Sequence, residues 1–107
     1  MEWVSPSDFI AHYSSNDKTQ LIDVRESYEF NVNHITGALN IPMGSILNCI
    51  ELINELCPVY VICQSGKRAA AVSNLLHVEH GFKKVYIVEG GMDALSEFSN
   101  VSSILSN

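Results

Sequence analysis

Short apolar segments alternate with longer amphipathic stretches along the chain. Runs of four or five residues that are apolar at successive positions predict strands buried on both faces, and the longer stretches predict helices. This alternation indicates an α/β fold with a small, open, mainly parallel sheet and helices on both faces. The predicted strands are Gln20–Val24, Ala38–Ile41, Val59–Ile62 and Lys84–Val88.

Helices are predicted wherever apolar residues recur at a spacing of three or four. The clearest runs from Arg68 to about Val78 and ends at Gly81, because glycine commonly terminates helices. Shorter helical patterns cover 5–13, 27–32, 45–56 and 92–98. We expect residues 1–99 to form one domain and residues 100–107 to form a tail that frays.

Composition narrows the class of protein. The chain has 107 residues, of which 47% are hydrophobic and 17% charged, which is typical of a globular domain. Its net charge of −6 and its lack of an apolar run of about 18 residues predict neither nucleic acid nor membrane as a partner. Three cysteines without disulfide or zinc spacing indicate reduced thiols and a cytoplasmic location.

The strongest chemical signal is the segment from Cys63 to Arg68. It follows the predicted strand 59–62 and opens the predicted helix, so Cys63 should lie at the carboxyl end of a strand, where α/β proteins collect ligands. Backbone N–H groups at the start of that helix favour an anion. Gly66 permits a tight turn, and Lys67 and Arg68 add positive charge. We expect Cys63 to be a reactive thiolate within this loop, although free cysteines are also commonly buried for packing alone.

Three better-known loop motifs do not fit the spacing. A phosphate-binding P-loop requires Ser or Thr after its Gly-Lys pair, and here Arg68 follows Lys67. A thioredoxin-like motif requires a second cysteine where Gly66 stands. A dinucleotide-binding loop requires three spaced glycines, which Gly90-Gly91 does not supply.

Four blocks, taken together and in order, resemble the signatures of the rhodanese family. The resemblance covers most of Gln20 to Leu95 and indicates a single-domain, rhodanese-like sulfurtransferase. The blocks are Leu21–Arg25 with Tyr28–Phe30, His34–Pro42, Cys63–Ala69 and Val88–Met92.

The resemblance implies chemistry through a persulfide. Cys63 would take the outer sulfur of a donor such as thiosulfate and pass it to cyanide or a thiol. The loop residues Gln64, Ser65, Gly66, Lys67 and Arg68 would bind the substrate, with Lys67 and Arg68 offsetting the donor's charge. No metal or organic cofactor is expected. Because only one domain is present, we expect an open pocket and a sulfur-relay protein as a partner.

Two other functions are compatible with this pattern. Phosphatases of related fold resemble a loop with five residues between Cys and Arg, whereas four separate Cys63 from Arg68. Non-catalytic rhodanese-like modules act as sulfur carriers or regulatory binding domains, and such members usually lack the loop cysteine that is present here. Sulfur transfer is therefore the leading hypothesis.

Other polar residues near the predicted strand ends are interpreted as structural. Asp23 and Arg25 follow one another closely at the end of a strand, and we expect a charged pair that braces neighbouring loops. Cys49 and Cys57 are expected to pack, although either would be placed to resolve an oxidised Cys63.

Overall fold

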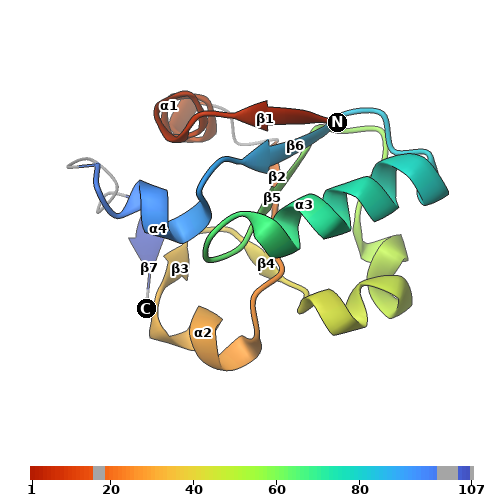
Figure 1. The fold of residues 1–107 in the computed structure, drawn as a ribbon, viewed down its shortest axis with the longest axis horizontal. Coiled ribbons are helices and arrows are strands. Elements are labelled where there is room, and N and C mark those ends of the chain that lie inside the picture. Colours follow the sequence, from red (N-terminus) through yellow and green to blue (C-terminus); the bar gives the residue numbers. More distant parts are fainter. Residues whose placement is uncertain (16–18, 99–103, 107) are drawn as a thin grey trace.

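A five-stranded parallel sheet forms the centre of the protein (Figure 1). The computed structural model describes residues 1–15, 19–98 and 104–106 of the chain. The strand order is β1-β6-β5-β2-β4, so β5 is central. The bounds are β1 (Glu2–Val4), β2 (Gln20–Asp23), β4 (Leu39–Asn40), β5 (Val59–Ile62) and β6 (Val85–Val88). The predicted α/β fold with a parallel sheet is confirmed.

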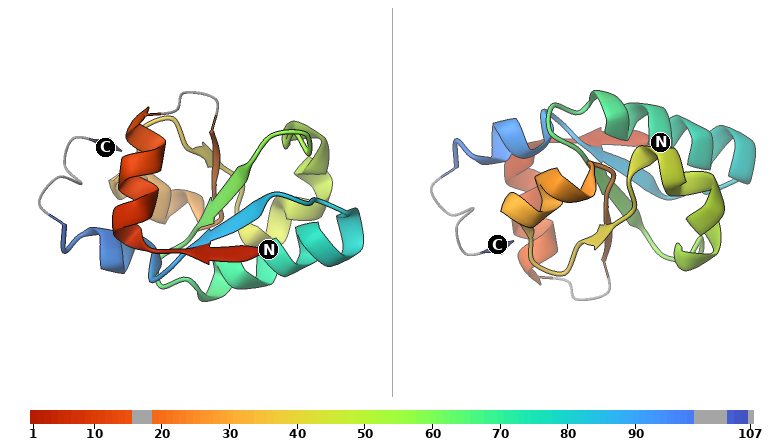
Figure 2. Two further views of the ribbon diagram at one scale, coloured as in Figure 1. Left: turned by 90° about the horizontal axis from the view of Figure 1, so that it is seen from above. Right: turned by 90° about the horizontal axis from the view of Figure 1, so that it is seen from below.

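Helices cover both faces of this sheet (Figure 2). Helix α3 and the 3-10 helix η1 pack on one face, whereas α1 and α4 pack on the other. Helix α2 joins the end of β2 to the segment before β4. The bounds are α1 (Pro6–Ser15), α2 (Ser27–Val32), η1 (Met43–Leu52), α3 (Lys67–Asn74), the π-helical turn η2 (Leu75–Glu79) and α4 (Gly91–Leu95).

The central strand feeds both hydrophobic cores. Successive side chains of a strand point to opposite faces, so Val59 and Val61 enter the core beneath α3, whereas Tyr60 and Ile62 enter the core beneath α1 and α4. All four residues of β5 are buried. This burial explains why the segment is apolar at every position, and it fixes the next residue, Cys63, on the α3 side.

The helix predicted over 45–56 is a 3-10 helix over Met43–Leu52. Bonds between residues three apart mark both ends, because the Ser45 N–H donates to the Pro42 carbonyl and the Ile53 N–H donates to the Ile50 carbonyl. The apolar residues Ile50, Ile53 and Leu56 recur in steps of three, which matches the three residues per turn of a 3-10 helix better than 3.6.

The end of the chain differs from the predicted frayed tail at residues 104–106. Strand β7 (Leu105–Ser106) pairs antiparallel with β3 (His34–Ile35), and Ile104 is buried. The remainder of the predicted tail lies outside the described residues. In the part of the chain that is described, no helix is long and apolar enough to cross a membrane.

Candidate active site

Cys63 directly follows the central strand and precedes the loop that leads into α3. The adjacent strands hold its backbone, since the Val24 N–H donates to the carbonyl oxygen of Ile62 at 3.0 Å. The Met92 N–H, from the first turn of α4, donates to the carbonyl oxygen of Cys63 itself at 2.9 Å. The peptide groups before and after Cys63 are therefore both held in place.

Two backbone amides converge on the sulfur. The Gly66 N–H donates to Cys63 Sγ at 3.0 Å, and the Ala69 N–H donates to it at 3.3 Å. Gly66 has a φ of +104°, a left-handed conformation in which a side chain would be strained, and this turn aims its amide at the sulfur. N–H donors that converge on one atom stabilise negative charge that develops there during a reaction. The amide of Ala69 was not among the residues predicted to form this site.

The expectation of an open pocket above Cys63 is wrong, because Cys63 has 0% of its surface exposed. The loop closes over the sulfur through Gly66, which is itself buried. A Cβ placed on Gly66 would lie 3.4 Å from the Gly90 nitrogen and 3.9 Å from the Trp3 ring. The residue at the top of this loop, Ser65, is exposed.

Arg25 connects the loops around this site through the N–H groups of its side chain. Its side chain is 2% exposed and pairs with the fully buried carboxylate of Asp23 at 2.9 Å. Its other N–H groups donate to the carbonyl oxygens of Asn33 and Glu29 and to Oε1 of Gln64. All five N–H groups of the guanidinium thus have acceptors, and none is left for a ligand.

The two cations of the loop have different surroundings. Arg68 forms a bidentate ion pair with Glu29 of α2, with N–O distances of 2.7 and 3.0 Å. The hydrogen bond from Arg68 is the largest cause that lowers the pKa of Glu29 to about 2, so this carboxylate stays ionised near neutral pH. The exposed Lys67 makes no ion pair within the described residues. Of the two positive charges that were predicted to bind the donor, that of Arg68 is therefore neutralised by Glu29, whereas that of Lys67 is exposed to solvent.

Gln64 connects the loop to its neighbours through its side-chain amide. Oε1 accepts from Arg25 at 3.2 Å, and Nε2 donates to the Asp93 carboxylate at 2.7 Å. The Asp93 N–H in turn donates to the carbonyl oxygen of Gln64 at 2.9 Å. Asp93 and Glu29 are both site residues that the sequence analysis missed. Neither carries a local signal, since the chain separates Gln64 from Asp93 by 29 residues and Glu29 from Arg68 by 39.

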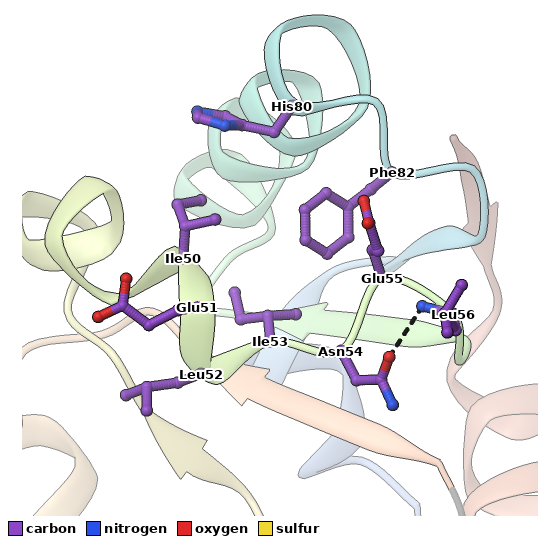
Figure 3. A pocket seen from close by; sticks show the side chains of 9 residues that line it. All are labelled: Ile50, Glu51, Leu52, Ile53, Asn54, Glu55, Leu56, His80 and Phe82. Carbon is purple, nitrogen blue, oxygen red and sulfur yellow. Dashed lines mark hydrogen bonds between the residues drawn. The ribbon is translucent and has the colours of Figure 1, made fainter.

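A cavity lies at the other edge of the sheet, near the start of β5 (Figure 3). Its volume is about 520 Å³, and Ile50, Leu56 and Phe82 are among its lining residues. Cys49 and Cys57 are both half-buried free cysteines; Cys49 packs against the core, and Cys57 Sγ accepts from Asn54 Nδ2 at 3.4 Å. Among the described residues, no group of His, Cys, Asp or Glu is placed to hold a metal ion.

The fold and site together define a class of small parallel α/β domains that hold one cysteine under a loop of backbone amides. The chain matches the family described as "Rhodanese-like domain" over residues 5–98. It belongs to that family.

Two of the relatives that the chain resembles carry names that refer to sulfur. The chain is 34% identical over 89 residues to YrkF of Bacillus subtilis, named as a candidate sulfur carrier protein; the match covers 83% of this chain and 48% of YrkF. It is 33% identical over 73 residues to the thiosulfate sulfurtransferase GlpE of Tolumonas auensis, with 68% of each covered. The crystal structure of SSP1007 from Staphylococcus saprophyticus matches with a TM-score of 0.77 and 30% identity, over 89% of this chain and 93% of that one.

Proposed function

We propose that this protein is a sulfurtransferase that carries sulfane sulfur on Cys63 as a persulfide. The observation that carries the proposal is the pair of N–H groups, from Gly66 and Ala69, that point at Sγ. Similarity to a thiosulfate sulfurtransferase over 68% of the chain supports the same reaction. Its three cysteines are all free, which favours work in a reducing compartment such as the cytoplasm.

The reaction consists of two displacements at sulfur. The Cys63 thiolate attacks the outer sulfur of thiosulfate, the S–S bond of the donor breaks, and its electron pair leaves with sulfite. Sγ then carries one additional sulfur, whose negative charge the loop amides stabilise. A thiol or cyanide attacks that outer sulfur, and the thiolate of Cys63 is the leaving group. The balance needs no oxidant, metal or organic cofactor.

The donor reaches Sγ only when the loop moves, because Cys63 is fully buried. Gln64 holds the loop to α4 through two hydrogen bonds with Asp93. These contacts involve few apolar atoms, and segments of this kind open at low free-energy cost. We expect residues 64–66 to open before each loading step.

The test is the intact mass of the protein after incubation with thiosulfate. We expect a gain of one sulfur atom that cyanide removes and that Cys63→Ser abolishes. Cys49→Ser is the matched control, because it removes a half-buried thiol outside the loop, and it should retain the gain. Loading of the Cys63→Ser variant, or no loading of the wild-type protein by any sulfane donor, would refute the proposal.

A sulfur carrier is the second candidate, and the closed loop over Cys63 favours it. A carrier would hold one sulfur per chain and release it to a partner protein of a sulfur relay. The two candidates differ in turnover with thiosulfate and cyanide. An enzyme continues to form thiocyanate at a constant rate, whereas a carrier yields about one equivalent per chain and then stops unless a protein acceptor is supplied.

A further inference from the structure

The charged side chains around the sulfur are arranged in pairs that cancel. Arg25 is matched by Asp23 in a buried ion pair, and Arg68 is matched by Glu29 through two hydrogen bonds. Arg68 lies next to Ala69, whose N–H contacts Sγ. The guanidinium of Arg68 is therefore turned toward a carboxylate of α2.

The charge of Lys67 in the loop and that of Asp93 in the neighbouring helix α4 also balance. Lys67 is exposed and positive, and Asp93, which is exposed and holds the Gln64 side chain, is negative. Once Cys63 is a thiolate, the site as a whole is negative. The protein adds to this with a formal net charge of −6. A dianionic donor would approach this site against an unfavourable potential, and its repulsion would be about twice that of a monoanion.

We propose that Cys63 takes sulfur faster from sulfane donors that carry at most one negative charge, such as a persulfide, than from dianions such as thiosulfate, because Glu29 neutralises Arg68. This inference rests on the proposed sulfur transfer at Cys63. For a persulfide donor, the thiolate of Cys63 attacks the outer sulfur, the donor's S–S bond breaks, and a thiolate leaves with the bonding pair. The charge that enters and the charge that leaves are then at most one unit.

Glu29 is a positioning residue in this account, since it acts through Arg68 and does not touch the sulfur. Substitution with Gln preserves the shape and the capping interaction, because either Glu or Gln at this third helical position can accept from the backbone of Glu26. The substitution removes the negative charge and leaves Arg68 cationic at the rim. The half-exposed position of Arg68 keeps its charge solvated.

The experiment compares two donors that differ mainly in charge: thiosulfate, a dianion, and methanethiosulfonate, a monoanion with a similar S–S bond. Rates of persulfide formation on Cys63 are measured by quenched intact mass. Glu29→Gln should accelerate loading by thiosulfate about tenfold and by methanethiosulfonate about threefold, since the free-energy gain scales with donor charge. Arg68→Gln should slow loading by both donors, and the effect should again be larger for thiosulfate than for methanethiosulfonate.

The matched control is Glu55→Gln, which removes one negative charge beside the cavity near the start of β5 (Figure 3), whereas Cys63 follows the other end of that strand. It should leave both rates unchanged, because screening is strong beyond about 10 Å at 0.1 M salt. The wild-type protein gives an independent test: added salt should accelerate thiosulfate more than methanethiosulfonate.

Three results would overturn the inference: equal factors for both donors in Glu29→Gln, a larger factor for the monoanion, or wild-type loading by thiosulfate that slows as salt rises. If Glu29 had only a structural role, Glu29→Gln would change the loading rates of both donors by the same factor. Absence of any sulfur on Cys63 with either donor would instead refute the proposed function, so the two failures are distinguishable.

Discussion

Gly91 sets the distance between α4 and the Cys63 loop, and replacing it with Ala should be more damaging than the same change at Gly44 or Gly81. A Cβ at Gly91 would lie 2.2 Å from the carbonyl oxygen of Cys63 and 2.8 Å from that of Gln64. These are the two oxygens that accept N–H groups from the first turn of α4. Relief of the clash must therefore break or lengthen both hydrogen bonds.

Gly81 and Gly44 allow the cost of the left-handed conformation to be measured separately from the cost of the steric clash. Gly81 has a φ of +72° and no atom within 4 Å of its Cβ position, whereas Gly44 has open space and no positive φ. Ala at Gly81 should cost only the left-handed conformation, about 1–2 kcal/mol. Ala at Gly91, with a φ of +56°, should cost that amount plus about 1–3 kcal/mol for overpacking. Ala at Gly44 should be neutral or stabilise the protein by up to about 1 kcal/mol.

Urea unfolding followed by circular dichroism measures these differences as shifts in the midpoint at constant slope. The expected order of stability is Gly44→Ala, wild type, Gly81→Ala and Gly91→Ala. Gly91→Ala should also lose sulfur loading on Cys63 under conditions in which it remains folded. A Gly91→Ala variant as stable as Gly81→Ala would refute the claim that this close approach holds α4 on the loop.

Three further predictions concern charge and access. Arg25→Met strands the buried Asp23 carboxylate, so the unfolding free energy should fall by about 3–5 kcal/mol in urea titrations; a loss below about 1 kcal/mol would contradict this. The pKa of Glu29 is lowered from 4.5 to about 2, so the contribution of Glu29 to stability is present above pH 4.5 and lost as pH falls toward 2. The wild-type protein should therefore lose more stability than Glu29→Gln over that interval. Parallel curves of stability against pH for the two proteins would disprove this. Iodoacetamide should modify the half-buried Cys49 before Cys63 in mass-mapped digests, and the reverse order would contradict a closed loop.

The local pattern predicted four of the five strands of the sheet, most clearly where burial on both faces leaves a direct record in the sequence, and it missed β1, in which no residue is buried. Each residue of β5 is buried, and each of its four positions is apolar or aromatic. The position of Cys63 follows from the same record, since it is the first residue after that strand. Strand β3 and its partner β7 lack such a record: each has two residues, and the pair joins segments about 70 positions apart.

The electrostatics of the site were less predictable than its position. Lys67 and Arg68 are adjacent in sequence, which favours a common role, yet the fold directs Arg68 to Glu29 and leaves Lys67 in solvent. Sequence alone gives the number of charges but not their partners, because ion pairs depend on contacts between distant elements. The buried pair of Asp23 and Arg25 was predictable because its members are two residues apart.

The contacts to the sulfur come from the main chain, and this determines which parts of the loop sequence are constrained. Gly66 supplies one N–H through a backbone conformation that side chains disfavour, and Gly91 allows α4 to approach closely enough to hold the Cys63 carbonyl. Side chains at Ser65 and Lys67 are exposed and make no contact with Sγ. The anion-stabilising geometry therefore depends on the two glycines, whereas the exposed side chains are free to adjust which donor and which acceptor approach the thiol.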